Sequence, residues 1–198
     1  MPRIILASES PARQNLLRQI KILFSVVPSK IQESQRRFAT PKEQVQTLAA
    51  EKARHVASRT KHGLVIGADT IIVRKGKVIG KPRTRSEAVK ILKELSGTTH
   101  SVFTGLAVVD AATGRSSVDY VKTSVKMKKL TQKEIEAYVS TGESFGKAGA
   151  YAAQGKGAIL IERVDGCYCN VVGLPLPKLG DMLKKFNVSL LRYDSRNV

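Results

Sequence analysis

A helix-start pattern, Thr-x-x-Glu, constrains the fold of this chain more than any other feature. The threonine hydroxyl in such a pattern caps the first turn, and the glutamate supports it from the helix side. The pattern begins at Thr40, Thr84 and Thr131. Apolar runs typical of strands lie between these starts, over residues 64–68, 71–73, 102–109 and 118–127. This alternation predicts α/β or mixed α+β architecture, with one curved sheet and flanking helices.

The beginning of the chain predicts a strand that runs directly into a helix. Residues 4–7 are apolar, and Ser10 followed by Pro11 suits an N-cap and a first helical position. Ser8 and Arg13 would surround the free amides of this helix start. The segment therefore favours binding of an anion. A last helix is expected over about residues 176–186.

Composition limits the classes of protein that this chain can represent. With 198 residues, 42% of them hydrophobic, it can bury a substantial core in one domain. A net charge of +18 indicates polyanionic partners or a particular intracellular environment. The basic residues are scattered, and only 5% of residues are aromatic, so a stacking surface for single-stranded nucleic acid is disfavoured.

The cysteines and the N-terminus indicate a cytoplasmic protein. Cys167 and Cys169 are the only cysteines, and in an extended segment both would face the same side as structural thiols. The three histidines lack the spacing of a zinc site. The N-terminal apolar stretch is too short for a signal peptide, and no apolar run approaches the about 20 residues of a membrane span.

Four polar residues stand where packing alone does not require them, and each has two interpretations. Lys52 lies within the apolar stripe of its helix, where it either extends its ammonium to water or binds an anion. Asp69 follows an apolar run, as a turn aspartate or as a group that binds metal or activates water. Lys81, between Gly80 and Pro82, is either a solvent-facing loop lysine or a lysine whose ammonium the flanking residues direct toward a ligand. Gln154 belongs to a surface loop or reads a base edge.

Short segments with these residues follow one another along nearly the whole chain. They are residues 6–13 (LASESPAR), Glu33, 51–53 (EKA), 67–70 (GADT), 80–82 (GKP), 95–97 (LSG) with His100, 104–105 (TG), 147–149 (KAG) with 151–155 (YAAQG), and 172–175 (VGLP). In this order they resemble the Maf family. Signatures of the P-loop, dinucleotide-binding, α/β-hydrolase and kinase classes are missing from the sequence.

The resemblance implies a fold and an activity. It implies a single domain over residues 1–198, related to the inosine-triphosphate pyrophosphatases, with a long mixed sheet and two lobes around a deep cleft. The implied reaction is hydrolysis of a nucleoside triphosphate to the monophosphate and pyrophosphate, by a cytoplasmic homodimer. A regulatory protein of septum formation and a basic nucleic-acid-binding module remain the alternatives.

The resemblance also implies roles for individual residues. Asp69 is the implied proton acceptor, and Glu33, Lys52 and Lys81 complete the catalytic set. Glu33 and Asp69 would hold a divalent metal, Mg²⁺ or alternatively Mn²⁺, that offsets the charge of the triphosphate. Ser8 and Arg13 would hold phosphate oxygens.

One position departs from the family pattern. The family usually reads S-x-S-P-R-R, and here Ala12 replaces the first arginine. The branch that acts on dTTP and UTP typically carries that arginine, a threonine after the aspartate and a glutamine in the late loop. Thr70 and Gln154 match this branch, and Ala12 does not. The resemblance therefore implies dTTP and UTP as substrates, with a broader or weaker base preference and room for modified pyrimidine nucleotides.

Overall fold

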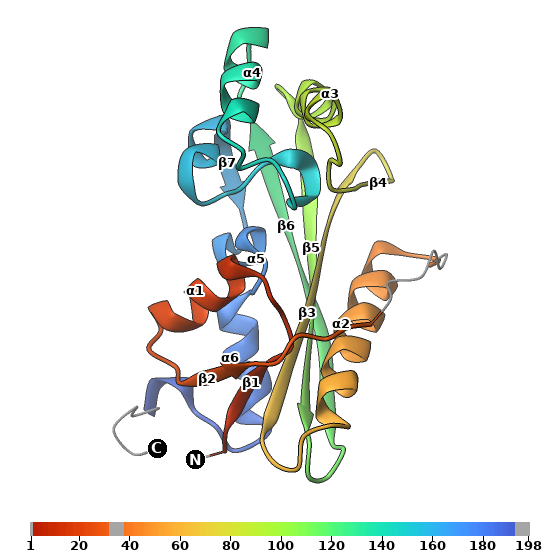
Figure 1. Ribbon diagram of the computed structural model, residues 1–198, viewed down its shortest axis with the longest axis vertical. Coiled ribbons are helices and arrows are strands. Elements are labelled where there is room, and N and C mark those ends of the chain that lie inside the picture. Colours follow the sequence, from red (N-terminus) through yellow and green to blue (C-terminus); the bar gives the residue numbers. More distant parts are fainter. Residues whose placement is uncertain (1, 32–37, 193–198) are drawn as a thin grey trace. The chain divides into compact units, whose positions relative to one another are not determined.

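The computed structural model describes residues 2–31 and 38–192, and its elements alternate as expected (Figure 1). The strands are β1 (Ile4–Leu6), β2 (Phe24–Val26), β3 (Leu64–Arg74), β4 (Lys77–Ile79), β5 (Thr99–Asp110), β6 (Ser116–Met127) and β7 (Ile161–Asp165). The α-helices are α1 (Pro11–Gln19), α2 (Pro41–Ala57), α3 (Arg85–Leu95), α4 (Gln132–Ser140), α5 (Tyr168–Val172) and α6 (Leu176–Lys184). Short 3₁₀ helices are η1 (Ala148–Ala150), η2 (Gly155–Leu160) and η3 (Leu190–Arg192).

The three predicted helix starts are confirmed. Thr40, Thr84 and Thr131 are the N-caps of α2, α3 and α4, and each hydroxyl accepts a hydrogen bond from the amide of the glutamate three residues later. At Thr131 the carboxylate of the glutamate in turn accepts a hydrogen bond from the backbone amide of the threonine. At the other two starts the carboxylate accepts from the residue before the cap, Ala39 or Arg83. Local sequence therefore fixes where these helices begin.

The strands form one mixed sheet, as predicted. Its order is β2-β1-β3-β5-β6-β7, and β4 pairs with β3 beside this path. β1 is parallel to both β2 and β3, whereas the β3–β4 and β6–β7 pairs are antiparallel. The expected strands 64–68 and 71–73 are in fact the single strand β3. Asp69 and Thr70 continue its extended backbone, so the predicted break between two strands is wrong.

The chain divides into two compact units, each with its own core. The first unit comprises residues 1–69, 104–121 and 173–198, and the second comprises residues 70–103 and 122–172. Strands β3, β5 and β6 contribute residues to both units. The core of the first unit is rich in small side chains: Ile5, Ala7, Ala49, Ala50, Ala53, Val56, Ala57, Val65, Ala107 and Val109.

Two glycines let α2 lie directly on the strands of the first unit. A Cβ atom added to Gly67 of β3 would lie 2.2 Å from the carbonyl oxygen of Ala49 in α2. A Cβ atom added to Gly105 of β5 would lie 2.0 Å from the carbonyl oxygen of Val45. Real Cβ atoms do not approach backbone so closely. The absence of side chains at these two positions therefore sets the distance between α2 and the sheet, and α2 runs beside β3 (Figure 1).

We expect Gly67→Ala to destabilise the protein by about 2 kcal/mol, because the methyl group forces α2 away from β3 and overpacks the core. Urea unfolding followed by circular dichroism measures the change. Gly80→Ala is the matched control, since a Cβ atom at Gly80 would have nothing within 4 Å. Equal stabilities of the two variants would contradict this account of the helix–sheet contact.

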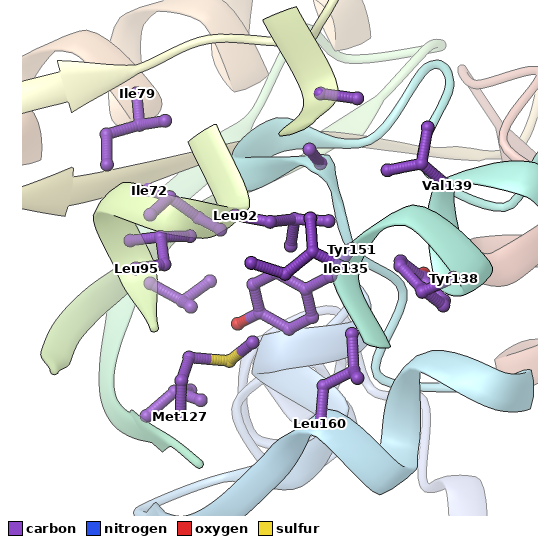
Figure 2. Close-up of a cluster of buried hydrophobic side chains, with 14 residues drawn as sticks. Ile72, Ile79, Leu92, Leu95, Met127, Ile135, Tyr138, Val139, Tyr151 and Leu160 are labelled. Carbon is purple, nitrogen blue, oxygen red and sulfur yellow. The ribbon is translucent and has the colours of Figure 1, made fainter. Parts of the chain in front are cut away.

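The core of the second unit contains larger side chains than the core of the first. It contains Leu92 and Leu95 of α3, Ile135 of α4 and Met127 of β6, all at most 2% exposed. Figure 2 shows the ring of Tyr151 among these side chains. A residue of the late glycine-containing segment is therefore part of the core, and the segment around it is not a plain surface loop.

One prediction about the cysteines is wrong. Cys169 lies in α5, not in an extended segment, because residues 168–172 form a short helix after the turn at Gly166. Both cysteines lie in the described part of the chain, and neither forms a disulfide there.

Candidate functional site

The start of α1 assembles two of the predicted phosphate ligands. Ser10 caps the helix by accepting from the amide of Arg13, as predicted. The Arg13 guanidinium donates to the hydroxyl of Ser8 over 3.0 Å, and through Nε to the carbonyl oxygen of Gly173 over 2.8 Å. Ser8 is 8% exposed. These bonds hold Arg13 across the helix start, and Ala12 lies beside it in the first turn.

The anomalous lysine of α2 has an anionic partner. The Nζ atom of Lys52 lies 2.6 Å from Oδ1 of Asp69, and the two side chains are 12% and 10% exposed. The close packing of α2 on Gly67, two residues before Asp69, brings the ammonium within this reach. Lys52 therefore does not merely extend to water: it forms a nearly buried ion pair with a strand carboxylate.

The turn position considered for Asp69 is wrong. It lies within β3, neither in a turn nor at the end of the strand. The parallel neighbour β1 pairs with β3 only as far as Leu6 opposite Ile66, and the amide of Ala7 adds one further bond to the carbonyl of Ile66. Ser8 and Asp69 therefore follow, on adjacent strands of the first unit, the point where β1 ends. Ser8 thus follows the carboxyl end of β1, where parallel strands commonly present polar groups, whereas Asp69 lies farther along the continuing strand β3.

The remaining described candidates belong to the second unit. Thr70 continues β3, and Lys81 is an exposed residue between β4 and α3. Gln154 precedes η2 and is partly exposed. The amide of Gly149 donates to the carbonyl of Gly80, so the residue before Lys81 is tied to the segment that leads to Gln154.

Glu33, predicted as a catalytic and metal-binding residue, lies outside the described residues. Within residues 2–31 and 38–192, no three carboxylate, histidine or cysteine side chains group together as a metal centre. Asp69 is the described member of the predicted metal pair.

The structure also reveals a buried pair that sequence reasoning did not assign. Nε2 of His100, in β5, lies 2.8 Å from the hydroxyl of Tyr151, and His100 is 2% exposed. Burial lowers the pKa of His100 from 6.5 to about 4, and the positive charge of Arg74 adds to this effect. The imidazole is therefore neutral near pH 7. The pair joins residues 51 positions apart, so no local pattern could have indicated it.

This pKa predicts a pH dependence of stability. Because His100 binds a proton at about pH 4 when folded and at about pH 6.5 when unfolded, folding is favoured above pH 6.5 and this contribution is lost as the pH falls to 4. The difference between the two pKa values corresponds to about 3 kcal/mol. Urea unfolding at several pH values should show this loss in the wild type and a smaller loss in His100→Gln. Parallel pH profiles of the two proteins would contradict the prediction.

None of the helices in the described part of the chain has the length and apolar character needed to cross a bilayer. Among solved structures, the fold resembles a HAM1 protein from Coxiella burnetii, with a TM-score of 0.52 and 16% identity over 93% of this chain and 100% of that one. This likeness supports the expected architecture.

Sequence comparisons connect the chain to named enzymes. A dTTP/UTP pyrophosphatase of Pelotomaculum thermopropionicum is 49% identical over 96% of this chain and 100% of the relative. A protein of the same name from Acetivibrio thermocellus is 49% identical over 97% of this chain and 99% of the relative. The family model described as "Maf-like protein" matches residues 3–186. The resemblance of the motifs is therefore confirmed, and the chain belongs to the Maf family.

Proposed function

We propose that this protein hydrolyses nucleoside triphosphates, dTTP and UTP foremost, to the nucleoside monophosphate and pyrophosphate. The observation that carries the proposal is the Lys52–Asp69 ion pair, nearly buried and in the same unit as Ser8 and Arg13. The names of the full-length relatives support the substrates. The same relatives favour an enzyme over the regulatory and nucleic-acid-binding alternatives. The physiological role would be removal of unwanted nucleotides from the pool.

The proposed chemistry is attack of water on the α-phosphorus. The oxygen of water bonds to phosphorus while the bond to the oxygen that bridges the α- and β-phosphates breaks, and pyrophosphate leaves. Asp69 accepts the proton of the attacking water, and Lys52 holds the carboxylate in place. Lys81, Arg13 and the amides at the start of α1 neutralise phosphate charge. The hydroxyl of Ser8, which Arg13 fixes, donates to a phosphate oxygen.

In the proposal, a divalent metal binds beside the Lys52–Asp69 pair. Lys52 contacts one oxygen of the Asp69 carboxylate, and the second oxygen is a hard ligand of the kind that Mg²⁺ prefers. In the proposal Asp69 and Glu33 hold the ion, with Mn²⁺ as the alternative to Mg²⁺. Such an ion, when bound, offsets the negative charge of the triphosphate.

Base preference is assigned to Thr70 and Gln154. The Gln154 amide both donates and accepts hydrogen bonds, as recognition of a pyrimidine edge requires. Ala12 offers no planar cation at the start of α1, so we expect weaker discrimination among bases than an arginine would give. Modified pyrimidine nucleotides are included in the proposed substrates for this reason.

The test is product analysis after incubation of the protein with Mg²⁺ and a panel of canonical and modified nucleoside triphosphates. Equal amounts of monophosphate and pyrophosphate, formed fastest from dTTP and UTP, are the expected result. Parallel reactions without Mg²⁺ and with Mn²⁺ test the metal. Release of inorganic phosphate in place of pyrophosphate, or no product from any nucleotide, would overturn the proposal.

The assembly and location of the enzyme are part of the same proposal. The family resemblance supports a homodimer, and the sparse use of cysteine suits the reducing cytoplasm. Light scattering on the purified protein measures the oligomer, and a mass of one chain at working concentration would reject the dimer.

A further inference from the structure

Gln154 stands at a helix start that another residue caps. It occupies the N-cap position of η2, yet in the described structure its side chain makes no capping hydrogen bond. Residues at this position normally use their own side chains to satisfy the first amides of the helix. At η2 the carboxylate of Glu143 does so: one oxygen accepts from the amide of Lys156 over 3.0 Å and the other from the amide of Gly157 over 3.1 Å.

Two glycines leave the space that this remote cap needs. Gly155 has a φ of +73°, and a Cβ atom there would lie 2.9 Å from the carboxylate of Glu143. A Cβ atom on Gly157 would lie 2.1 Å from the carbonyl oxygen of Ala152. The backbone after Gln154 therefore folds back on the segment before it, and the carboxylate of Glu143 packs against this turn of backbone at Gly155.

The backbone before Gln154 is held from two further sides. The hydroxyl of Tyr138 accepts from the amide of Ala152 over 3.0 Å, and the hydroxyl of Tyr168 donates to the carbonyl of Ala153 over 2.9 Å. Tyr138 belongs to the core of this unit and is 4% exposed (Figure 2). Burial raises the pKa of Tyr138 to about 12, and the charge of Glu143 adds to the rise, so the hydroxyl keeps its proton.

These contacts fix the main chain on both sides of Gln154 and leave its amide to serve a ligand. We propose that Glu143 is a positioning residue for base recognition: by capping η2 in place of Gln154, it holds the Gln154 amide ready to bind the edge of a pyrimidine base. This inference rests on the proposed function, because it assumes that Gln154 reads the base. A preformed amide loses less conformational entropy on binding than a mobile one.

Glu143→Gln tests the proposal, because the neutral side chain keeps its size but has one oxygen to offer two amides. We expect the KM for dTTP and UTP to rise about 10-fold with kcat within about 2-fold, and the preference for these substrates over CTP and dCTP to shrink. Glu162→Gln is the matched control, since Glu162 pairs with Lys126 on the exposed surface of the same unit. It should leave both constants and the preference unchanged.

Two further measurements separate positioning from a general structural role. In a Gln154→Ala background, Glu143→Gln should not reduce the preference further, because Glu143 acts through Gln154. Amide hydrogen exchange should become faster at Lys156 and Gly157 in Glu143→Gln and stay unchanged in α3. An unchanged KM and preference in an active Glu143→Gln variant would overturn this inference and leave the pyrophosphatase proposal intact. An inactive wild type would instead reject the proposed function, and with it the assignment of Glu143 to base recognition.

Discussion

Asp69→Asn should lower turnover of dTTP and UTP by at least about 10²-fold while the protein still folds. The amide keeps the shape of the carboxylate and an oxygen for Lys52, but it cannot take a proton from water or offer a charged metal ligand. We expect stability to fall by only about 1 kcal/mol, because the flexible stem of Lys52 lets its ammonium move toward water.

Steady-state pyrophosphate release with saturating nucleotide measures the effect, and circular dichroism with urea unfolding checks the fold. Asp165→Asn is a suitable control, because Asp165 forms an exposed ion pair with Arg163 in β7. Turnover within a few-fold of the wild type in Asp69→Asn would remove both the base and the metal role from this residue.

Lys52→Met should abolish turnover and also destabilise the protein by about 3 kcal/mol. The carboxylate of Asp69 lies on a strand and is only 10% exposed, so it cannot move into solvent when the ammonium of Lys52 is removed. Loss of one member of a buried pair leaves an uncompensated charge, which costs more than loss of both. The two single substitutions should therefore differ in stability, although both remove activity.

The double variant Lys52→Met/Asp69→Asn provides the decisive comparison. It should recover most of the stability lost in Lys52→Met, because no buried charge remains, and it should stay inactive. Urea unfolding of all four proteins gives the coupling between the two residues. Independent, additive stability changes would show that the 2.6 Å contact contributes no energy, and the site would then need another account of Lys52.

Local sequence predicted the parts of the fold that local contacts determine. The caps of α2, α3 and α4 depend on residues within one turn, and all three were predictable at the level of the residue. The lysine in the stripe of α2 was recognisable as anomalous because a helix face has a fixed period. Its partner Asp69 lies 17 residues farther along the chain, so only the three-dimensional structure identifies the pair.

The failed predictions involve contacts that a local pattern cannot specify. The polar residues Asp69 and Thr70 predict an interruption between residues 64–68 and 71–73, yet both continue β3. The local pattern predicts an extended segment around Cys169, where the structure has the short helix α5. The supports of Gln154 come from Tyr138, Glu143 and Tyr168, which lie outside the motif that carries it. A single sequence therefore suggests candidate site residues through their motifs, but it does not indicate which residues hold them in place.

Attempts to change the substrate range of this enzyme should take into account that Gly67 and Gly105 have no side chain. Mutagenesis directed only at positions with polar side chains would leave both glycines unchanged, because neither carries a functional group. The lack of a side chain at each position nevertheless lets α2 lie close to the sheet, and this sets how far the ammonium of Lys52 lies from Asp69 in β3. Selection for altered activity should therefore rarely recover a larger residue at Gly67 or Gly105, because an added Cβ atom would collide with the backbone of α2.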